Sequence, residues 1–388
     1  MPIGNLHELA ISNLQSGNSK LDIRHSKLPV STLVLTPNLT GDDGISRLSR
    51  LIVRAFDDVS VLALHEPPSC TRFEHAPVQS AGGSTTRFAA LTVQLAARQH
   101  PDTTVIVVHI HLAPAALALT ARGASLVTCL CGIEAWTPLS WPQRAAIQQS
   151  RRLIAISHYT IERFRLANPR AGDRPIDVCH PGIELAASPE STFRAAAAVT
   201  RGTPPSALIV GRMSAEERYK GHDRLLEIWP QVVSEFKSAR LEIVGDGDDR
   251  PRLAQKSEEM GLASSVTFHG RVSKEQLCRH YERCAVFVMP SRNEGFGLVF
   301  LEAMRARRAC IGATGAASEI IDDGRTGLLV PPGSTTKLTD ALVTLLRNQS
   351  VAASMGEQGR ARFLAHFTEE RFRSRLHAVV PQSEKTFA

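Results

Sequence analysis

Short, mostly apolar runs recur along the chain, and each is followed by a segment in which apolar residues return every three or four positions. Runs of the first kind are typical of parallel strands covered on both faces, and the second spacing is typical of amphipathic helices. Their alternation predicts parallel sheets with right-handed helical crossovers. We expect strands at residues 30–36, 59–64, 104–108, 125–131, 152–156 and 176–179, and then at 207–210, 241–244, 266–269, 285–289, 309–313 and 327–330.

The rhythm is interrupted once, by a stretch rich in Ala, Ser, Thr and Pro, and we place an interdomain linker there at residues 189–205. The fold class is therefore α/β, with two doubly wound Rossmann-like domains, at 29–188 and 206–365, facing a central cleft. Residues 1–28 are polar and without periodicity, which predicts a poorly ordered lead-in. We expect the last helical stretch, 366–388, to pack back toward the first domain.

Composition narrows the class of protein. The chain has 43% hydrophobic and 21% charged residues, an ordinary globular balance. No apolar run reaches the roughly 18–20 residues that a membrane span needs, and the start of the chain does not resemble a signal peptide, so we expect a cytoplasmic protein. Seven cysteines, an odd and scattered set, do not suggest a disulfide framework. The net charge of +7 suits a nucleotide diphosphate or an anionic membrane surface, and no basic arm for nucleic acid is present.

The stretch from 285 to 310 predicts a strand, a tight loop and a helix at the carboxyl edge of the second sheet. Such a junction offers unpaired helix N–H groups and the positive end of a helix dipole to an anion. Glu294 in the loop and Glu302 in the helix place two carboxylates there. One carboxylate can meet a sugar while the other meets a ribose; taken alone, the pair can equally be a solvated surface feature.

Two cations follow the first strand of the second domain. Arg212 and Lys220 are eight residues apart on one loop, and Lys220 comes just before a helix. Arginine can hold phosphate oxygens in a bidentate manner while lysine acts as a point charge, so the pair suits a diphosphate. A glycine loop at Gly245 and a turn ending at Val272 follow the next two strands. Together with the cation loop and the loop that carries Glu294, they make four segments at the same edge of the sheet.

The motifs GRMSAEERYKG, IVGDGDDR, VTFHGRVSKEQL, PSRNEGFGLVFLEAMRARRAC and DDGRTGLLVPPG occur in this order across the whole second domain. As a set they resemble the retaining glycosyltransferases of family 4, which have the GT-B fold. The first domain is similar more loosely, through TPNLTGDDGISRL, LCGIEAW, AISHYTIERF and HPGIE.

The resemblance implies a role for each matching position. Arg212 and Lys220 would neutralise the departing diphosphate, and Glu294, the third expected catalytic residue, would contact the hydroxyls of the donor sugar. Donor binding would further involve Glu302 at the ribose, backbone groups near the base, backbone N–H groups of the loop near the sugar and phosphates, and a first-domain glycine: Gly245, Val272, Gly295, Phe296, Gly297 and Gly44.

The implied reaction moves a hexose-type sugar from a UDP- or GDP-linked donor to a glycan or lipid-linked acceptor. It retains the anomeric configuration, needs no cofactor or metal, and lets the leaving phosphate help to deprotonate the acceptor. A double displacement would need a carboxylate nucleophile under the anomeric carbon, and the sequence does not clearly supply one.

One position departs from the family pattern, because Cys131 stands before Gly132 where many relatives have His-Gly. The imidazole that normally faces the donor sugar is therefore missing. Three explanations are open: His109 or His111 compensates for it, the donor sugar differs, or activity is reduced. We expect Cys131, Glu134 and His109 on the acceptor side; a structural cap is an equal hypothesis for Glu134. A weaker alternative is a zinc site formed by His109, His111, Cys129 and Cys131.

Two hypotheses other than a transferase stay open: a catalytically silent protein that binds nucleotide sugars or glycans, and a GT-B nucleotide-sugar epimerase. A phosphorylase is a weaker third hypothesis, because we see no motif for a pyridoxal-phosphate lysine. Contact with an anionic membrane is a further hypothesis, with a solvated face as its alternative. It depends on arginines expected in consecutive first-domain helices: Arg144, Arg151, Arg152, Arg163 and Arg165.

Overall fold

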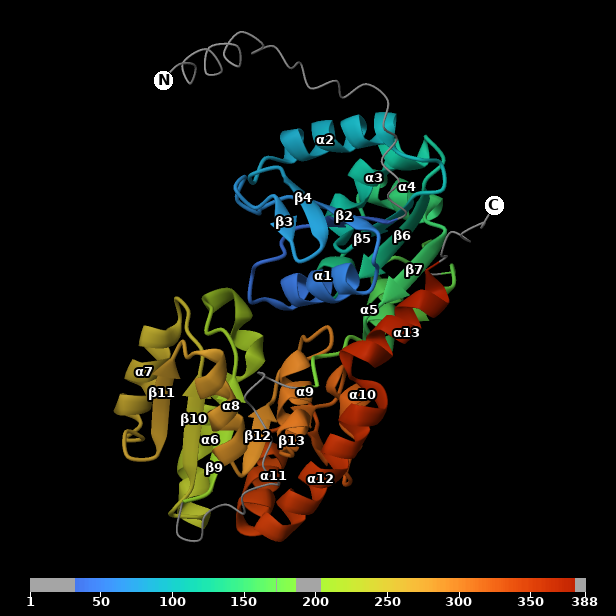
Figure 1. The fold of residues 1–388 in the computed structure, drawn as a ribbon. Coiled ribbons are helices and arrows are strands. Elements are labelled where there is room, and N and C mark those ends of the chain that lie inside the picture. Colours follow the sequence, from blue (N-terminus) through green and yellow to red (C-terminus); the bar gives the residue numbers. More distant parts are fainter. Residues whose placement is uncertain (1–31, 172, 186–203, 381–388) are drawn as a thin grey trace, which may run out of the picture.

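A computed structural model of the chain describes residues 32–171, 173–185 and 204–380 (Figure 1). The predicted lead-in at 1–28 and nearly all of the predicted linker at 189–205 lie outside the described residues. The described residues form two α/β domains, each with its own sheet, and the expected fold class is confirmed.

The first sheet has eight strands in the order β3-β4-β2-β1-β5-β6-β7-β8. Every pairing in it is parallel except the short β3–β4 pair. Its strands are β1 (Thr32–Thr36), β2 (Val59–Ala63), β3 (Arg72–Phe73), β4 (Ala76–Ser80), β5 (Thr104–Val107), β6 (Ser125–Leu130), β7 (Arg152–Ala155) and β8 (Ile176–Val178). The helices around it are α1 (Gly44–Arg54), α2 (Thr85–Arg98), α3 (Ala113–Thr120), α4 (Trp141–Gln149) and α5 (His158–Ala167), with short 3-10 turns η1 (Ile110–Leu112) and η2 (Ile133–Ala135).

The second sheet is parallel throughout its described strands, in the order β11-β10-β9-β12-β13-β14. These are β9 (Ser206–Val210), β10 (Arg240–Val244), β11 (Val266–Gly270), β12 (Val286–Met289), β13 (Ala309–Ala313) and β14 (Gly327–Val330). The helices are α6 (His222–Glu235), α7 (Arg250–Glu259), α8 (Lys274–Arg283), α9 (Leu298–Arg305), α10 (Ala317–Ile320), α11 (Thr335–Arg347), α12 (Gln349–His366) and α13 (Glu369–Val379), with the 3-10 segment η3 (Ala215–Lys220). The order reverses between β9 and β12, and ligands of such sheets bind at this switch point.

The twelve strands expected from the sequence are present, with small differences at their ends. The hairpin of β3 and β4 was not expected. β4 alternates buried and exposed residues and contains Pro77, while β3 has only two residues. A short edge pair with a proline carries too weak a pattern to be recognised from sequence.

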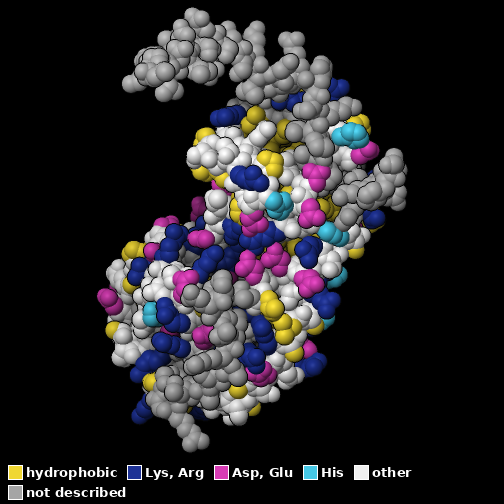
Figure 2. Space-filling view, in the orientation of Figure 1, with side chains coloured by type: hydrophobic (Ala, Val, Ile, Leu, Met, Phe, Trp, Pro, Cys, Tyr) yellow, Lys and Arg dark blue, Asp and Glu magenta, His cyan; other side chains and the backbone are white. Residues whose placement is uncertain are grey.

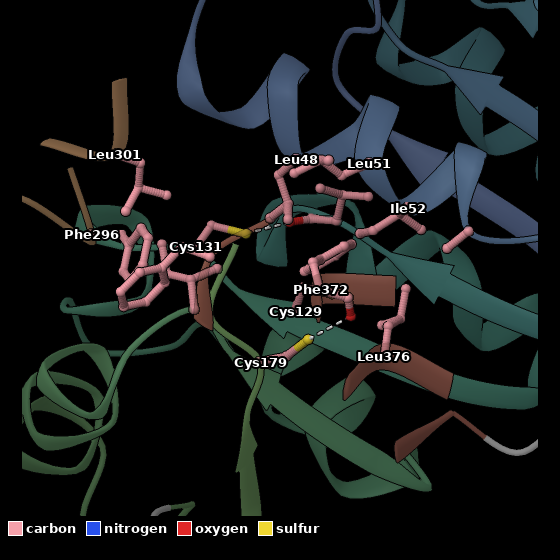
Figure 3. Close-up of a cluster of buried hydrophobic side chains, with 14 of the residues drawn as sticks. Leu48, Leu51, Ile52, Cys129, Cys131, Cys179, Phe296, Leu301, Phe372 and Leu376 are labelled. Atoms are coloured by element: carbon pink, nitrogen blue, oxygen red, sulfur yellow. Dashed lines mark hydrogen bonds between the residues drawn. The ribbon is translucent and has the colours of Figure 1, made fainter. Parts of the chain in front are cut away.

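The last helix leaves the second domain and packs on the first (Figure 1). A parallel bridge joins Ile183 to Thr368, and a ring nitrogen of His377 lies 2.6 Å from the carbonyl oxygen of Ala55 at the end of α1. Phe372 and Leu376 are 1% exposed and belong to the same apolar cluster as the core residues of α1 (Figure 3). The chain therefore ties the two domains together a second time.

Among the helices of the described ranges, none combines the length and the apolar character that crossing a bilayer requires.

Candidate functional site

The two cations predicted to bind a diphosphate lie together at the end of β9. Glu217, between them on η3, accepts hydrogen bonds from both. Arg212 donates from Nε (2.9 Å) and Nη2 (2.5 Å), and Lys220 donates from Nζ (2.9 Å). A single carboxylate thus holds a guanidinium and an ammonium at one point, where an anionic ligand would meet both. Sequence reasoning missed Glu217, although its spacing of three from Lys220 on a helical turn signals the contact.

The pKa shifts follow from this arrangement. The hydrogen bonds that the Arg212 guanidinium donates to Glu217, against some burial, raise the pKa of Arg212. Burial acts to raise the pKa of Glu217, but the hydrogen bonds and charges of Arg212 and Lys220 outweigh it and lower that pKa. Arg212 and Glu217 are therefore both charged at neutral pH.

Close backbone packing fixes the loops that carry these cations. Gly221 has φ +95°, and a Cβ there would lie 2.7 Å from the ring of Pro290 at the end of β12. Gly245 has φ +137°, and a Cβ there would lie 2.0 Å from the carbonyl oxygen of Gly211. Only glycine allows both the conformation and the contact. The loops after β9, β10 and β12 therefore pack directly against one another.

Glu294 lies beside the cation pair, in the loop between β12 and α9. Its Oε1 is 3.4 Å from the hydroxyl of Ser291. Burial raises the pKa of its carboxyl group, the ammonium of Lys220 opposes this shift, and Glu217 adds to it. The loop is joined to η3 by a backbone hydrogen bond from Arg292 to Tyr219 (3.1 Å). The three predicted catalytic residues are thus brought together.

A small pocket opens next to Glu294 at the carboxyl ends of β12 and β13. It is lined by Tyr159 of the first domain and by second-domain residues: Met289, Ser291, Arg292, Glu294, Phe300, Ala313, Thr314, Gly315, Ala316 and Ala317. Its lining combines apolar side chains with a few polar groups, as in many small-ligand sites.

The second predicted carboxylate, Glu302 on α9, is 7% exposed and already has two partners. Arg47 of α1 donates to its Oε1 (2.6 Å) from across the domain boundary, and the Tyr281 hydroxyl of α8 donates to its Oε2 (2.8 Å). The charge of Glu302, more than the burial that opposes it, raises the pKa of Arg47. Burial, and next the charge of Glu302, raise the pKa of Tyr281.

Sequence reasoning missed both of these partners. Arg47 is 255 residues from Glu302 along the chain, and Tyr281 stands in a helix of ordinary amphipathic pattern. Neither position carries a local signal, because both contacts exist only once the two domains and α8 have packed. A ribose at Glu302 would have to share or replace these donors.

The loop with Gly295, Phe296 and Gly297 touches the first domain directly. Ser157, the N-cap of α5, donates to the carbonyl oxygen of Gly295 (2.7 Å). A Cβ at Gly295 would lie 2.5 Å from the carbonyl oxygen of Cys131. Phe296 is 3% exposed and stacks on His180. Contacts with Ser157, Cys131 and His180 therefore hold the predicted sugar-binding loop against the first domain.

A carboxylate of the second domain caps α5 at the same boundary. Glu319 of α10 accepts hydrogen bonds from the backbone N–H groups of His158 (2.9 Å) and Tyr159 (2.8 Å), and it pairs with His180 (2.7 Å). Burial alone would raise its pKa, but these hydrogen bonds outweigh burial and lower it. Figure 2 shows Lys and Arg side chains gathered with Asp and Glu where the two domains meet.

The three acceptor-side candidates come together at the ends of β5 and β6. The thiol of Cys131 donates to the carbonyl oxygen of Val108, next to His109, and the backbone N–H of Cys131 donates to Oε1 of Glu134 (2.8 Å). Glu134 is thereby bound to the backbone of its own loop. Cys131 is 6% exposed and packs among apolar side chains of α1 and Phe296 (Figure 3). Its thiol therefore does not supply the group that an imidazole would present to a sugar.

The zinc site suggested by His109, His111, Cys129 and Cys131 does not form. Within the described residues, their ligand atoms do not gather closely enough to share an ion. Burial raises the pKa of both thiols, which keeps them protonated, and burial together with His111 lowers the pKa of His109 to about 4. All seven cysteines lie in described residues, and each is a free thiol.

Gly44 is the first residue of α1, and a Cβ there would meet nothing within 4 Å among the described atoms. The carboxylate of Asp43 already accepts hydrogen bonds from the N–H groups of Ile45 (2.9 Å) and Ser46 (3.0 Å). This helix start is therefore capped by an acid instead of being open to a phosphate. The predicted contact of Gly44 with a diphosphate stays a prediction.

On the expected base side, Gly245 donates its N–H to the carbonyl oxygen of Gly270 (2.9 Å). Val272 follows two residues later and is partly buried against the apolar cluster of α8 and α9. The two positions predicted to meet the base are thus neighbours at the carboxyl ends of β10 and β11.

The arginines of the membrane hypothesis are not all helical, which corrects that expectation. Arg152 begins β7 and lies 3.7 Å from Asp177, while Arg151 precedes that strand. Arg163 on α5 covers the ring of Trp136 (5.4 Å to the centroid). Part of this charge is therefore used in local contacts.

Comparisons with known proteins agree with this geometry. The family described as "Glycosyl transferases group 1" matches residues 204–348. A GDP-mannose-dependent monoacylated α-(1-6)-phosphatidylinositol monomannoside mannosyltransferase of Corynebacterium glutamicum is 30% identical over 269 residues, which cover 63% of this chain and 68% of that protein. A GDP-mannose-dependent α-(1-6)-phosphatidylinositol monomannoside mannosyltransferase of Mycobacterium tuberculosis is 31% identical over 216 residues, 53% of this chain and 55% of that protein. The chain thus matches about half the length of the mycobacterial relative.

Solved structures share the fold. HepE of Anabaena, in complex with UDP and glucose, superposes with a TM-score of 0.73 at 19% identity, over 90% of this chain and 98% of that one. Sucrose-phosphate synthase of Thermosynechococcus elongatus gives the same TM-score, identity and coverage. At 19% identity, the likeness to these two structures establishes the fold alone.

Proposed function

This chain belongs to the group 1 glycosyltransferases, GT-B proteins of the family 4 type, and on that premise we propose that it transfers a hexose-type sugar from a UDP- or GDP-linked donor to a glycan or lipid-linked acceptor. The observation that carries the proposal is the cation pair. Arg212 and Lys220 converge on one carboxylate beside Glu294 and its pocket. A diphosphate has the charge and oxygen geometry to take the place of that carboxylate.

We further propose that the reaction retains the anomeric configuration and uses no metal. The bond between the anomeric carbon and the phosphate oxygen breaks as the acceptor oxygen attacks from the same face, and the acceptor proton passes to the leaving phosphate. Arg212 and Lys220 stabilise the charge that develops on the diphosphate. Glu294 accepts hydrogen bonds from the hydroxyl groups of the sugar and keeps the anomeric carbon in place.

The relatives guide the choice of donor and acceptor. The two bacterial relatives are named as GDP-mannose-dependent enzymes that act on phosphatidylinositol mannosides. GDP-mannose and an acidic glycolipid are therefore the first donor and acceptor to test, with UDP-glucose second because HepE binds UDP and glucose. A lipid-linked acceptor would bring the chain to the cytoplasmic face of a membrane, and its net charge of +7 favours an anionic surface.

The proposal is tested by donor binding and turnover. We expect UDP, GDP or one of their sugar conjugates to raise the melting temperature selectively, and a rise to persist in the presence of EDTA, because a ligand of the native state stabilises it. Lys220→Ala and Glu294→Ala should abolish transfer. Lys337→Ala, which removes an exposed lysine of α11, is the matched control and should transfer normally.

Near-normal turnover in either site variant would refute the assignment. A silent binding protein is the second candidate, because the Cys131 thiol is buried and leaves the sugar without the expected imidazole. That candidate predicts a nucleotide-dependent rise in melting temperature with neither transfer nor donor hydrolysis.

A further inference from the structure

Three side chains with metal-binding atoms meet behind the base side of the site, on β10, β11 and α8. They are Glu242, His269 and His280, and their ligand atoms all lie within 4.8 Å of one another. Nδ1 of His280 is 2.8 Å from Oε2 of Glu242, and Nε2 of His269 is 3.6 Å from the same oxygen. Nothing in the proposed transfer reaction uses these groups.

An irregularity of the sheet aims His269 at this point. Ile243 pairs with Phe268 and Val244 pairs with Gly270, so His269 is the extra residue of a β-bulge. Bulges redirect a side chain and are common near functional sites. A regular strand would not leave His269 unpaired opposite β10.

The geometry leaves one ligand atom without a hydrogen bond. Nε2 of His269 is buried and has no hydrogen-bond partner among the described residues. Its ring lies 4.3 Å from the ring of His280 between centroids, and the single oxygen of Glu242 stands before both rings. A hydrogen-bond network explains the contact between His280 and Glu242. It does not explain why a second imidazole is placed there with a buried, unused nitrogen.

We propose that Glu242, His269 and His280 bind one divalent transition-metal ion, zinc by the nature of the ligands. Two imidazoles and one carboxylate are a recurrent zinc set, with water in the fourth position. Tetrahedral zinc with ordinary bond lengths separates its ligand atoms by about 3.4 Å. The two separations from Glu242, 2.8 and 3.6 Å, bracket this value, and the third, between the two imidazoles, is at most 4.8 Å, so modest side-chain rotations suffice.

The ion would tie α8 to the edge of the second sheet. His280 is followed on α8 by Tyr281, whose hydroxyl holds Glu302 at 2.8 Å. Metal binding would therefore fix the helix that positions the predicted ribose carboxylate. This consequence, unlike the metal site itself, depends on the proposed function.

The experiment uses the full chain, with any affinity tag removed, stripped of metal with EDTA and dialysed. We expect it to take up about one zinc ion per chain from ZnCl2, measured by elemental analysis after dialysis. Zinc should raise the melting temperature, EDTA should reverse the rise, and Co²⁺ should produce the visible absorption of a tetrahedral site. His269→Ala and His280→Ala should each weaken zinc binding at least about tenfold.

Two further variants make the test decisive. Glu242→Gln keeps the shape of the side chain and should fold with an unchanged metal-free melting temperature while losing zinc. His100→Ala is the control and should bind zinc like the parent chain, because among the described residues His100 is paired with a single carboxylate, Asp102 at 3.2 Å. Absence of stoichiometric zinc in the parent chain, or parent-like affinity in Glu242→Gln and His269→Ala, would overturn the proposal. Zinc uptake is measured without nucleotide, so its failure is separate from a failure of donor binding.

Discussion

Replacing Glu217 by glutamine should strengthen nucleotide binding, although the residue lies inside the predicted donor site. In the free chain its carboxylate accepts three hydrogen bonds, two from Arg212 and one from Lys220. A diphosphate that binds these cations must compete with a negative charge already placed between them. Glu217→Gln removes that charge and keeps nearly the same volume.

The size of the effect follows from distance and exposure. Two unit charges about 4 Å apart interact by about 1 kcal/mol in bulk water and about 4 kcal/mol at the surface of a protein. The Arg212 side chain is 60% exposed, so the lower part of that range applies to it. We expect a gain of about 1–2 kcal/mol, which corresponds to binding tighter by a factor of about 5–30.

Titration calorimetry with GDP and UDP at pH 7 measures this gain. The Glu217 carboxyl has a lowered pKa, so its charge is present at neutral pH and disappears only as the pH falls through that lowered value. Glu216→Gln is the matched control, because it changes the net charge equally at an exposed neighbouring position. If Glu217→Gln bound nucleotide more weakly than the parent chain, Glu217 would instead pre-organise the cations, and the competition argument would be refuted.

Three further changes test the packing around the site. Arg47→Gln leaves the charge of Glu302 buried without its cation and should lower the free energy of unfolding by about 1–3 kcal/mol in urea titrations. The loss should be smaller than for a fully buried ion pair, because the Arg47 side chain is 32% exposed. An unchanged midpoint would show that the pair is not formed. Gly245→Ala should cost more than about 2 kcal/mol because its Cβ would clash with a carbonyl oxygen, whereas Gly324→Ala, with φ +74° but open space, should cost only about 1 kcal/mol; equal losses would contradict the close approach. Glu319 has a pKa below its ordinary 4.5, so its contribution to stability is complete above that value and is lost as the pH falls through the lowered pKa; Glu319→Gln should flatten this acid dependence in denaturation curves.

Much of the architecture follows from local pattern. Strands buried on both faces are continuous apolar runs, and their helices repeat at 3.6 residues, so the twelve main strands and both sheets could be predicted. The hairpin of Arg72–Phe73 and Ala76–Ser80 was missed, since a two-residue strand has no period to read. The carboxyl edge of a parallel sheet also collects the loops after β9, β10, β11 and β12, which is why Arg212, Lys220 and Glu294 could be grouped from the sequence alone.

The rest was decided by contacts between distant segments. Whether a carboxylate is open or occupied depends on what packs against it, and Glu302 meets Arg47 only after the two domains close. The direction of the Cys131 thiol is likewise set by the carbonyl oxygen of Val108 on a neighbouring strand. The sequence by itself determined the sheets, their helices and the residues gathered at one edge, because these depend on periodicity and chain order. Only the tertiary structure decided which charges are paired and that Nε2 of His269 is buried without a hydrogen bond among the described residues, because burial and long-range contacts carry no local signal.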